Sequence, residues 1–201
     1  TLLLARQLGN IRVGIIGLGA GTLAHYALKG DHYTFYEINP LVTDLARTQF
    51  DFVRQSPALI DIVPGDARLS LEREAPQKFD VLLVDAFSGD AIPVHLLTRE
   101  AFGLYFRHLK PQGVLAVHVT NRFLDLPPVV EASARAFGGR TAKISSPEDQ
   151  PNAIFQATWM LVDRPGAASG STAIPATLPP SEERVVRTWT DDYSNLIEIM
   201  K

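Results

Sequence analysis

Three glycines at alternate positions, Gly17, Gly19 and Gly21, follow an apolar, β-branched stretch and precede a segment with helical spacing. Glycines at such a junction permit tight backbone angles and let a ligand approach the N-terminus of the next helix closely. A dinucleotide site has the spacing G-x-G-x-x-G/A, but Thr22 stands at the last of these positions. The run therefore favours an adenosyl-sulfonium ligand of the S-adenosylmethionine type over NAD. A tight turn without a ligand is the alternative.

Two acidic residues end the next two predicted strands. Glu37 comes 20 residues after Gly17, where a carboxylate can accept hydrogen bonds from both ribose hydroxyls. Asp66 can accept a hydrogen bond from the adenine amino group, with the backbone N–H of Ala67 facing a ring nitrogen. A solvated loop position is the alternative for Glu37. Asp66 can also be the N-cap of the following helix, and the two roles are compatible.

Asp85 ends an otherwise apolar stretch, FDVLLVD. Ligands of open α/β folds bind at the carboxyl ends of the strands, and a carboxylate there needs a cationic or hydrogen-bonding partner to offset its desolvation. We therefore interpret Asp85 as functional, whereas Asp90 suits a helix cap equally well. His118 and Asn121 follow a later strand at the same sheet edge and are candidates for either a structural or a functional role.

Strand patterns and helix patterns alternate along the chain. Strands are predicted over residues 11–17, 33–37, 60–63, 79–85, 114–120, 141–144 and 158–162, and helices over residues 22–29, 41–52, 67–74, 98–109 and 127–137. Pro40 suits the first turn of the second helix, and Thr98 suits an N-cap. This alternation predicts an α/β fold of βαβ units, with a mostly parallel, seven-stranded sheet covered by helices on both faces.

The chain divides into three segments. Residues 1–163 form the predicted nucleoside-binding domain. Residues 164–180 contain four Pro, two Gly and a single charged residue, which is typical of a mobile loop or linker. Residues 181–201 regain apolar character and are expected to pack back on the domain.

Composition excludes several classes of protein. The chain has 201 residues, 46% of them hydrophobic, no Cys and a net charge of −3. The lack of Cys excludes disulfides, zinc ribbons, iron–sulfur sites and a thiol nucleophile. Without a Lys/Arg run, nucleic acid is not an expected partner. The His residues have no metal-ligand spacing, so no metal is expected, and a divalent-ion methyltransferase that uses Asp85 with Asn121 is the alternative. No stretch of roughly 18 apolar residues predicts a membrane span.

Four stretches of the sequence, VGIIGLGAGT, FYEINP, GDAR and FDVLLVDAFSGDAIPVHLLT, resemble the spermidine synthase (polyamine aminopropyltransferase) family. Within this family, the sequence is more similar to the bacterial spermidine-synthase-like branch, some members of which are fused to membrane helices. The resemblance covers residues 12–121, and a weaker resemblance is found in TDDYSNL at residues 190–196. It implies the Rossmann-like class I methyltransferase fold with seven strands, in agreement with the strand count.

The resemblance also implies an activity and a site. The activity is aminopropyl transfer from decarboxylated S-adenosylmethionine to a polyamine amine, with Asp85 as the catalytic carboxylate. The nucleoside and its sulfonium tail are expected to contact Gly17, Gly19, Ala20, Gly21, Glu37, Ile38, Asp66, Ala67 and Asp85. The amine acceptor is expected near Asp90, His118, Asn121, Asp192 and Tyr193. A homodimer and a cytoplasmic location are compatible with this family.

Three departures from the family pattern keep alternatives open. Ala20 stands where the family has an acidic residue that holds the aminopropyl amine, and Ser88 stands where it has its second carboxylate. The small N-terminal β-domain has no counterpart, and the chain begins at Thr1 rather than Met. We therefore expect a piece of a longer chain with that β-domain or a membrane segment. The alternatives are an S-adenosylmethionine-dependent methyltransferase with a small acceptor, for which Ile15 replaces the usual acid, and a non-catalytic nucleoside-binding module.

Overall fold

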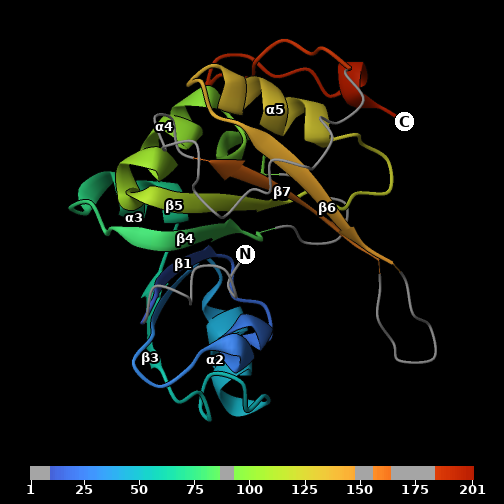
Figure 1. Ribbon diagram of the computed structural model, residues 1–201. Coiled ribbons are helices and arrows are strands. Elements are labelled where there is room, and N and C mark those ends of the chain that lie inside the picture. Colours follow the sequence, from blue (N-terminus) through green and yellow to red (C-terminus); the bar gives the residue numbers. More distant parts are fainter. Residues whose placement is uncertain (1–9, 87–92, 148–155, 164–183) are drawn as a thin grey trace.

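A single seven-stranded sheet forms the centre of the molecule (Figure 1). The computed structural model describes residues 10–86, 93–147, 156–163 and 184–201. The strand order is β3-β2-β1-β4-β5-β7-β6. Strands β1 to β5 pair in parallel, whereas β7 runs antiparallel to both of its neighbours. The strands are β1 Arg12–Ile16, β2 His32–Glu37, β3 Leu59–Pro64, β4 Phe79–Val84, β5 Leu109–His118, β6 Thr141–Ser146 and β7 Ala157–Asp163.

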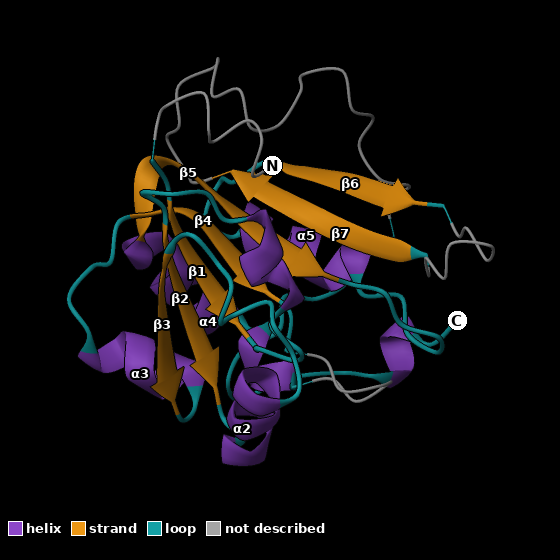
Figure 2. Cartoon of the chain, turned by 90° about the horizontal axis from the view of Figure 1, so that it is seen from below, coloured by secondary structure: helices purple, strands orange, loops and turns teal. Residues whose placement is uncertain are grey.

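Helices cover both faces of this sheet, as the cartoon seen from below shows (Figure 2). The α-helices are α2 Pro40–Thr48, α3 Ala67–Arg73, α4 Arg99–His108 and α5 Pro127–Arg135, and the 3-10 helices are η2 Thr22–Tyr26, η3 Val94–Leu96 and η5 Ile197–Ile199. Successive side chains of a strand point to opposite faces. Ile16 thus packs with α3, α4 and α5, while Val13 and Ile15 pack with η2 and α2. The predicted fold is confirmed.

Side-chain caps set the starts of three helices. The Asn39 side chain accepts a hydrogen bond from Leu41 N at 3.0 Å at the start of α2, with Pro40 in its first turn. The Asp66 side chain accepts one from Leu69 N at 2.9 Å at the start of α3. Thr98 is the N-cap of α4, as predicted, and accepts from Ala101 N at 3.3 Å. Each cap satisfies an amide that a helix start leaves without a partner.

The structure corrects several predicted boundaries. Instead of a helix over residues 22–29, the chain forms only the 3-10 turn η2. Gly21 offers no side-chain cap there, and the Asp31 carboxylate binds Leu28 N and so fixes the following turn. The second helix ends at Thr48 rather than at residue 52, and the fifth ends at Arg135 rather than at residue 137. Strand β5 starts at Leu109, five residues early, because its pairing with β4 runs through an irregularity.

The C-terminal residues 184–201 lie against α4 and α5 (Figure 1, red). Trp189 is fully buried in the core on that side of the sheet. Its carbonyl accepts a hydrogen bond from Arg99 N at 2.8 Å, and the carbonyl of Ile199 accepts one from Asp125 N at 2.7 Å. The segment is therefore held against the domain by backbone hydrogen bonds and by the buried side chain of Trp189. The predicted loop at residues 164–180 lies outside the described residues.

Candidate functional site

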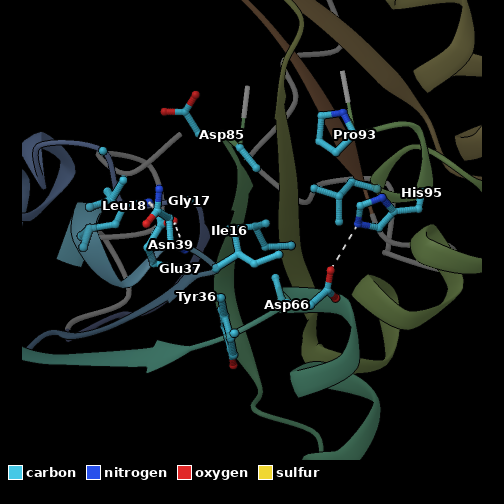
Figure 3. A pocket seen from close by; sticks show the side chains of 17 residues that line it. Ile16, Gly17, Leu18, Tyr36, Glu37, Asn39, Asp66, Asp85, Pro93 and His95 are labelled. Carbon is cyan, nitrogen blue, oxygen red and sulfur yellow. Dashed lines mark hydrogen bonds and ion pairs between the residues drawn. The ribbon is translucent and has the colours of Figure 1, made fainter. Parts of the chain in front are cut away.

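A cavity of about 420 Å³ opens where β1, β2, β3 and β4 end (Figure 3). Seven of the predicted nucleoside contacts line it: Gly17, Gly19, Glu37, Ile38, Asp66, Ala67 and Asp85. Its volume falls in the range of about 300–1,000 Å³ that is typical of small-molecule sites. Ala20 and Gly21 are not among the residues that line it, so their predicted contacts stay predictions.

The loop between β1 and η2 passes very close to the end of β4. Gly17 has a φ of +98°, and its amide donates to Tyr36 O at 2.9 Å. A Cβ added at Gly17 would lie 2.3 Å from the carbonyl oxygen of Asp85. Only glycine accommodates both this backbone angle and this approach. Gly17 therefore holds the ends of β1, β2 and β4 together at the mouth of the cavity.

Glu37 connects that loop to the start of α2. Its side chain is buried. Its Oε2 accepts a hydrogen bond from Leu18 N at 2.9 Å, and its Oε1 accepts one from Asn39 N at 2.8 Å. An ionised carboxylate has about four lone-pair sites, so each oxygen can accept a further hydrogen bond from a ligand hydroxyl. The carboxylate thus shapes the loop and still offers acceptors to the cavity.

Asp66 and His95 lie at the end of the cavity opposite Asp85 (Figure 3). While Asp66 Oδ1 caps α3, its Oδ2 lies 3.4 Å from His95 Nε2. Asp66 therefore does have the cap role that the sequence allowed. Pro93 and Leu96 add apolar surface near His95. This end of the cavity suits a flat, partly apolar base with an exocyclic amino group, because Asp66 can accept a hydrogen bond from the amino group and Pro93 and Leu96 can contact the ring.

Asp85 is paired with a histidine from the next strand. Its Oδ1 lies 2.8 Å from His118 Nδ1, and His118 Nε2 lies 2.7 Å from Thr120 Oγ1. Trp159 of β7 stacks on the imidazole, with the ring centroids 4.8 Å apart and the ring planes 18° apart. The structure thus brings Asp85 and His118 together, although the sequence predicted only that both lie at one sheet edge.

The remaining predicted acceptor residues lie elsewhere. Asn121 is buried, and its side-chain oxygen accepts hydrogen bonds from Phe123 N and Leu124 N at 2.9 and 2.8 Å, which shapes a turn. Asp192 is exposed. Tyr193 lies beneath the guanidinium of Arg187, whose Cζ is 4.0 Å from the ring centroid. Asp90 lies outside the described residues.

The analysis of the sequence did not identify several residues that line the cavity as ligand contacts, among them Tyr36, Asn39, Pro93, His95 and Leu96. Tyr36 donates its hydroxyl to Glu74 Oε2 at 2.8 Å, and burial together with that bond raises the pKa of the phenol well above its usual value. Asn39 before Pro40 carries a helix-start signal in the sequence. For His95 and Leu96 there is no such local signal, because only the fold brings them to the cavity.

A second hollow adjoins the first and shares Pro93 and His95 with it. Arg68 of α3 makes a two-pronged pair with Asp191 of the C-terminal segment, one contact being Nη1 to Oδ1 at 2.7 Å. Thr98 Oγ1 donates to the same Asp191 oxygen at 2.8 Å. The hydrogen bond from Arg68 holds the pKa of the Asp191 carboxyl below its usual value. This pair fastens the C-terminal segment beside the cavity.

The Arg68–Asp191 pair predicts a pH dependence of stability. A carboxyl whose pKa is lowered by folding stabilises the protein above its unfolded-state value, near 3.8, and loses that effect as the pH falls through the folded value. We expect Asp191→Asn to be less stable than the natural chain at pH 7 and to approach it as the pH falls from about 5 to about 2. Urea unfolding at several pH values measures this. Asp192→Asn is the same change at an exposed neighbour, and its free energy of unfolding should vary with pH in parallel with that of the natural chain. A parallel pH dependence for Asp191→Asn would contradict the prediction.

Two general features of the chain can be stated for its described part. No group of three or more His, Asp or Glu side chains there is arranged to hold a metal ion. No helix in those residues is long and apolar enough to cross a bilayer.

Comparisons with known proteins place this geometry in context. No protein-family profile matches the chain. A polyamine aminopropyltransferase of Vibrio vulnificus is 31% identical over 151 residues, which are 72% of this chain and 49% of that protein. The chain thus spans about half the length of this curated relative.

Two solved structures of similar fold belong to different classes of enzyme. The crystal structure of a probable spermidine synthase from Corynebacterium glutamicum matches with a TM-score of 0.60 and 22% identity, over 81% of this chain and 60% of that one. An O-methyltransferase from Bacillus cereus in complex with SAH matches with a TM-score of 0.58 and 15% identity, over 81% and 77% of the two chains. The chain therefore has the class I methyltransferase-like fold and is related in sequence to the spermidine synthase (polyamine aminopropyltransferase) family.

Proposed function

We propose that the chain is the nucleoside-binding domain of a spermidine-synthase-like transferase. The enzyme would move an aminopropyl group from decarboxylated S-adenosylmethionine to an amine of a polyamine. The observation that carries the proposal is the order of three carboxylates along one cavity. Asp66 lies at one end, Asp85 lies at the other, and Glu37 also lines the cavity. The sequence relationship to a polyamine aminopropyltransferase supports the same reaction class.

The residues of the cavity fit an adenosyl ligand. Asp66 Oδ2 would accept the adenine amino group, between the apolar walls of Ile38 and Leu96. The lone pairs that remain on the Glu37 carboxylate would accept the two ribose hydroxyls. The tail of the ligand would then pass the glycine loop toward Asp85.

Asp85 would act on the attacking amine. When bound, the co-substrate supplies a carbon activated by its positively charged sulfur. A primary amine with a pKa of about 10.4 is mostly protonated at pH 7, and freeing its lone pair costs about 4.6 kcal/mol. Asp85 would hold and orient the ammonium and accept its proton. The C–N bond forms as the C–S bond breaks, and the electron pair leaves on sulfur as a neutral thioether, which needs no acid.

The far end of the acceptor would be held by an acidic residue of the C-terminal segment. Asp191, one acidic residue of the TDDY stretch, is held by Arg68 and Thr98. We therefore assign the distal ammonium of a polyamine to Asp192, near Tyr193. His118 and Asn121 would act by shaping the site behind Asp85.

Methyl transfer from S-adenosylmethionine is the second candidate. It is favoured by the fold match to an O-methyltransferase and by Ala20, which offers no charge to an aminopropyl amine. The cavity contacts would be the same in both reactions, so the two candidates differ in the tail of the ligand and in the acceptor.

Calorimetric titration of the chain tests the proposal. The four ligands are decarboxylated S-adenosylmethionine, S-adenosylmethionine, methylthioadenosine and NAD. We expect the decarboxylated form and methylthioadenosine to bind and NAD to remain silent. Glu37→Gln should weaken binding about 10- to 100-fold, because it loses a charge-assisted acceptor and turns an amide donor toward a backbone N–H.

Asp61→Asn, at an exposed carboxylate of β3, is the matched control and should bind like the natural chain. A preference for S-adenosylmethionine would replace aminopropyl transfer by methyl transfer. Silence toward all four ligands, from a folded sample, would contradict the proposal and favour a module that binds no nucleoside by itself.

A further inference from the structure

The contact between Asp85 and His118 indicates how the Asp85 side chain is oriented. A carboxylate only accepts hydrogen bonds, so the bond of 2.8 Å between Asp85 Oδ1 and His118 Nδ1 requires the imidazole proton on Nδ1. Thr120 Oγ1 lies 2.7 Å from His118 Nε2 and accepts a hydrogen bond from Thr158 N at 2.7 Å. The Thr120 hydroxyl keeps its own proton and can donate it to Nε2. The Thr120 contact is therefore compatible with the Nδ1–H form that the Asp85 contact requires.

The imidazole is also fixed from its face. Trp159 stacks on it, with nearly parallel rings. Trp159 and His118 are direct cross-strand partners in the antiparallel pairing of β5 with β7. Three separate contacts, one at each ring nitrogen and one at the ring face, therefore set the orientation of His118 relative to Asp85.

We propose that His118 is the positioning residue of Asp85. Its Nδ1–H holds Oδ1, so that the second oxygen, Oδ2, is presented toward the amine in a fixed direction. Oδ2 has no hydrogen-bond partner among the described residues. His118 does not line the cavity, so it acts through Asp85 rather than on the substrate. This inference rests on the proposed function, since it assigns Asp85 its role in the transfer.

Replacements at position 118 separate the donor from the ring. His118→Phe keeps an aromatic ring over Trp159 but has no donor for Asp85. We expect kcat to fall about 10- to 100-fold, because a misplaced catalytic group is costly, while affinity for methylthioadenosine stays within about twofold. His118→Gln loses the ring but can donate an amide N–H to Asp85, and it should recover most of kcat. Thermal unfolding shows which variants are folded.

A double-mutant cycle distinguishes positioning from a general structural effect. If His118 works through Asp85, adding His118→Phe to Asp85→Asn should lower kcat no further. Additive losses, or full activity of folded His118→Phe while Asp85→Asn is inactive, would overturn the inference and leave the proposed function standing. Full activity of Asp85→Asn would instead overturn the proposed function.

The tautomer of His118 tests the inference without any measurement of enzyme activity. Long-range ¹H–¹⁵N NMR of the imidazole should show the proton of His118 on Nδ1 in the natural chain. In Asp85→Ala the acceptor is lost, and we expect the Nε2–H form to increase. A ring proton on Nε2 alone in the natural chain would contradict the inference whatever reaction the protein performs.

Discussion

Replacing Asp85 with Asn is expected to lower kcat for the proposed transfer by about 10²–10⁴-fold, the usual contribution of a general base. The side chain keeps its size and keeps an oxygen that can accept from His118 Nδ1. It loses the charge that holds an ammonium and the capacity to accept its proton. Since Asp85 lies at the opposite end of the cavity from Asp66, affinity for methylthioadenosine should change little. Steady-state kinetics together with calorimetry measure both quantities.

The same substitution at Asp61 is the control for Asp85→Asn. Asp61, which lies within β3, is another carboxylate beside a histidine, with its Oδ2 2.6 Å from His32 Nε2, but it does not line the cavity. Asp61→Asn should keep full activity. Equal losses in the two variants would mean that the activity responds to a carboxylate–histidine pair anywhere in the fold, and the assignment of Asp85 as the reacting base would fail.

Gly17→Ala is expected to destabilise the domain by about 3 kcal/mol or more and to abolish nucleoside binding. The added Cβ would lie 2.3 Å from Asp85 O and 2.9 Å from Asp85 C, both backbone atoms that cannot rotate away. The φ of +98° adds strain for any side chain. Relief would require β1 and β4 to separate at their carboxyl ends, which is where the cavity lies. Urea unfolding and titration with methylthioadenosine measure the two effects.

Gly19→Ala is the matched comparison in the same loop. Gly19 also has a positive φ, +53°, but a Cβ there would meet nothing within 4 Å. We therefore expect a loss of only about 1–2 kcal/mol from backbone strain. The difference between the two variants isolates the close approach of Gly17 to β4. Similar losses of stability in both variants would show that backbone angle alone matters at these positions.

Much of the fold could be predicted from the sequence because it depends on local, periodic signals. The apolar stretches before Gly17 and Asp85 are buried strands, and such a stretch predicts a buried strand whichever elements pack against it. Thr98, Asn39 and Asp66 start helices through bonds to amides only two or three residues away. Glu37 could be named as a site residue because its distance from Gly17 follows from a βαβ unit.

The errors occur where long-range contacts decide. The predicted helix at residues 22–29 is only a 3-10 turn, and the carboxylate that fixes the following turn, Asp31, also binds Ile11 N, 20 residues earlier. Strand β5 starts before the predicted position because β4 is its pairing partner there. Local spacing carries no information about which neighbour is present.

The sequence by itself determined which residue types could bind an adenosyl ligand and that they end successive parallel strands. Only the tertiary structure decided how those residues are paired. His118 reaches Asp85 across 33 residues, and Arg68 reaches Asp191 across 123. Trp159 reaches His118 only because β7 runs antiparallel to β5. The orientation of a side chain depends on the partners that satisfy its hydrogen bonds, and those partners are brought together by the order of the strands in the sheet.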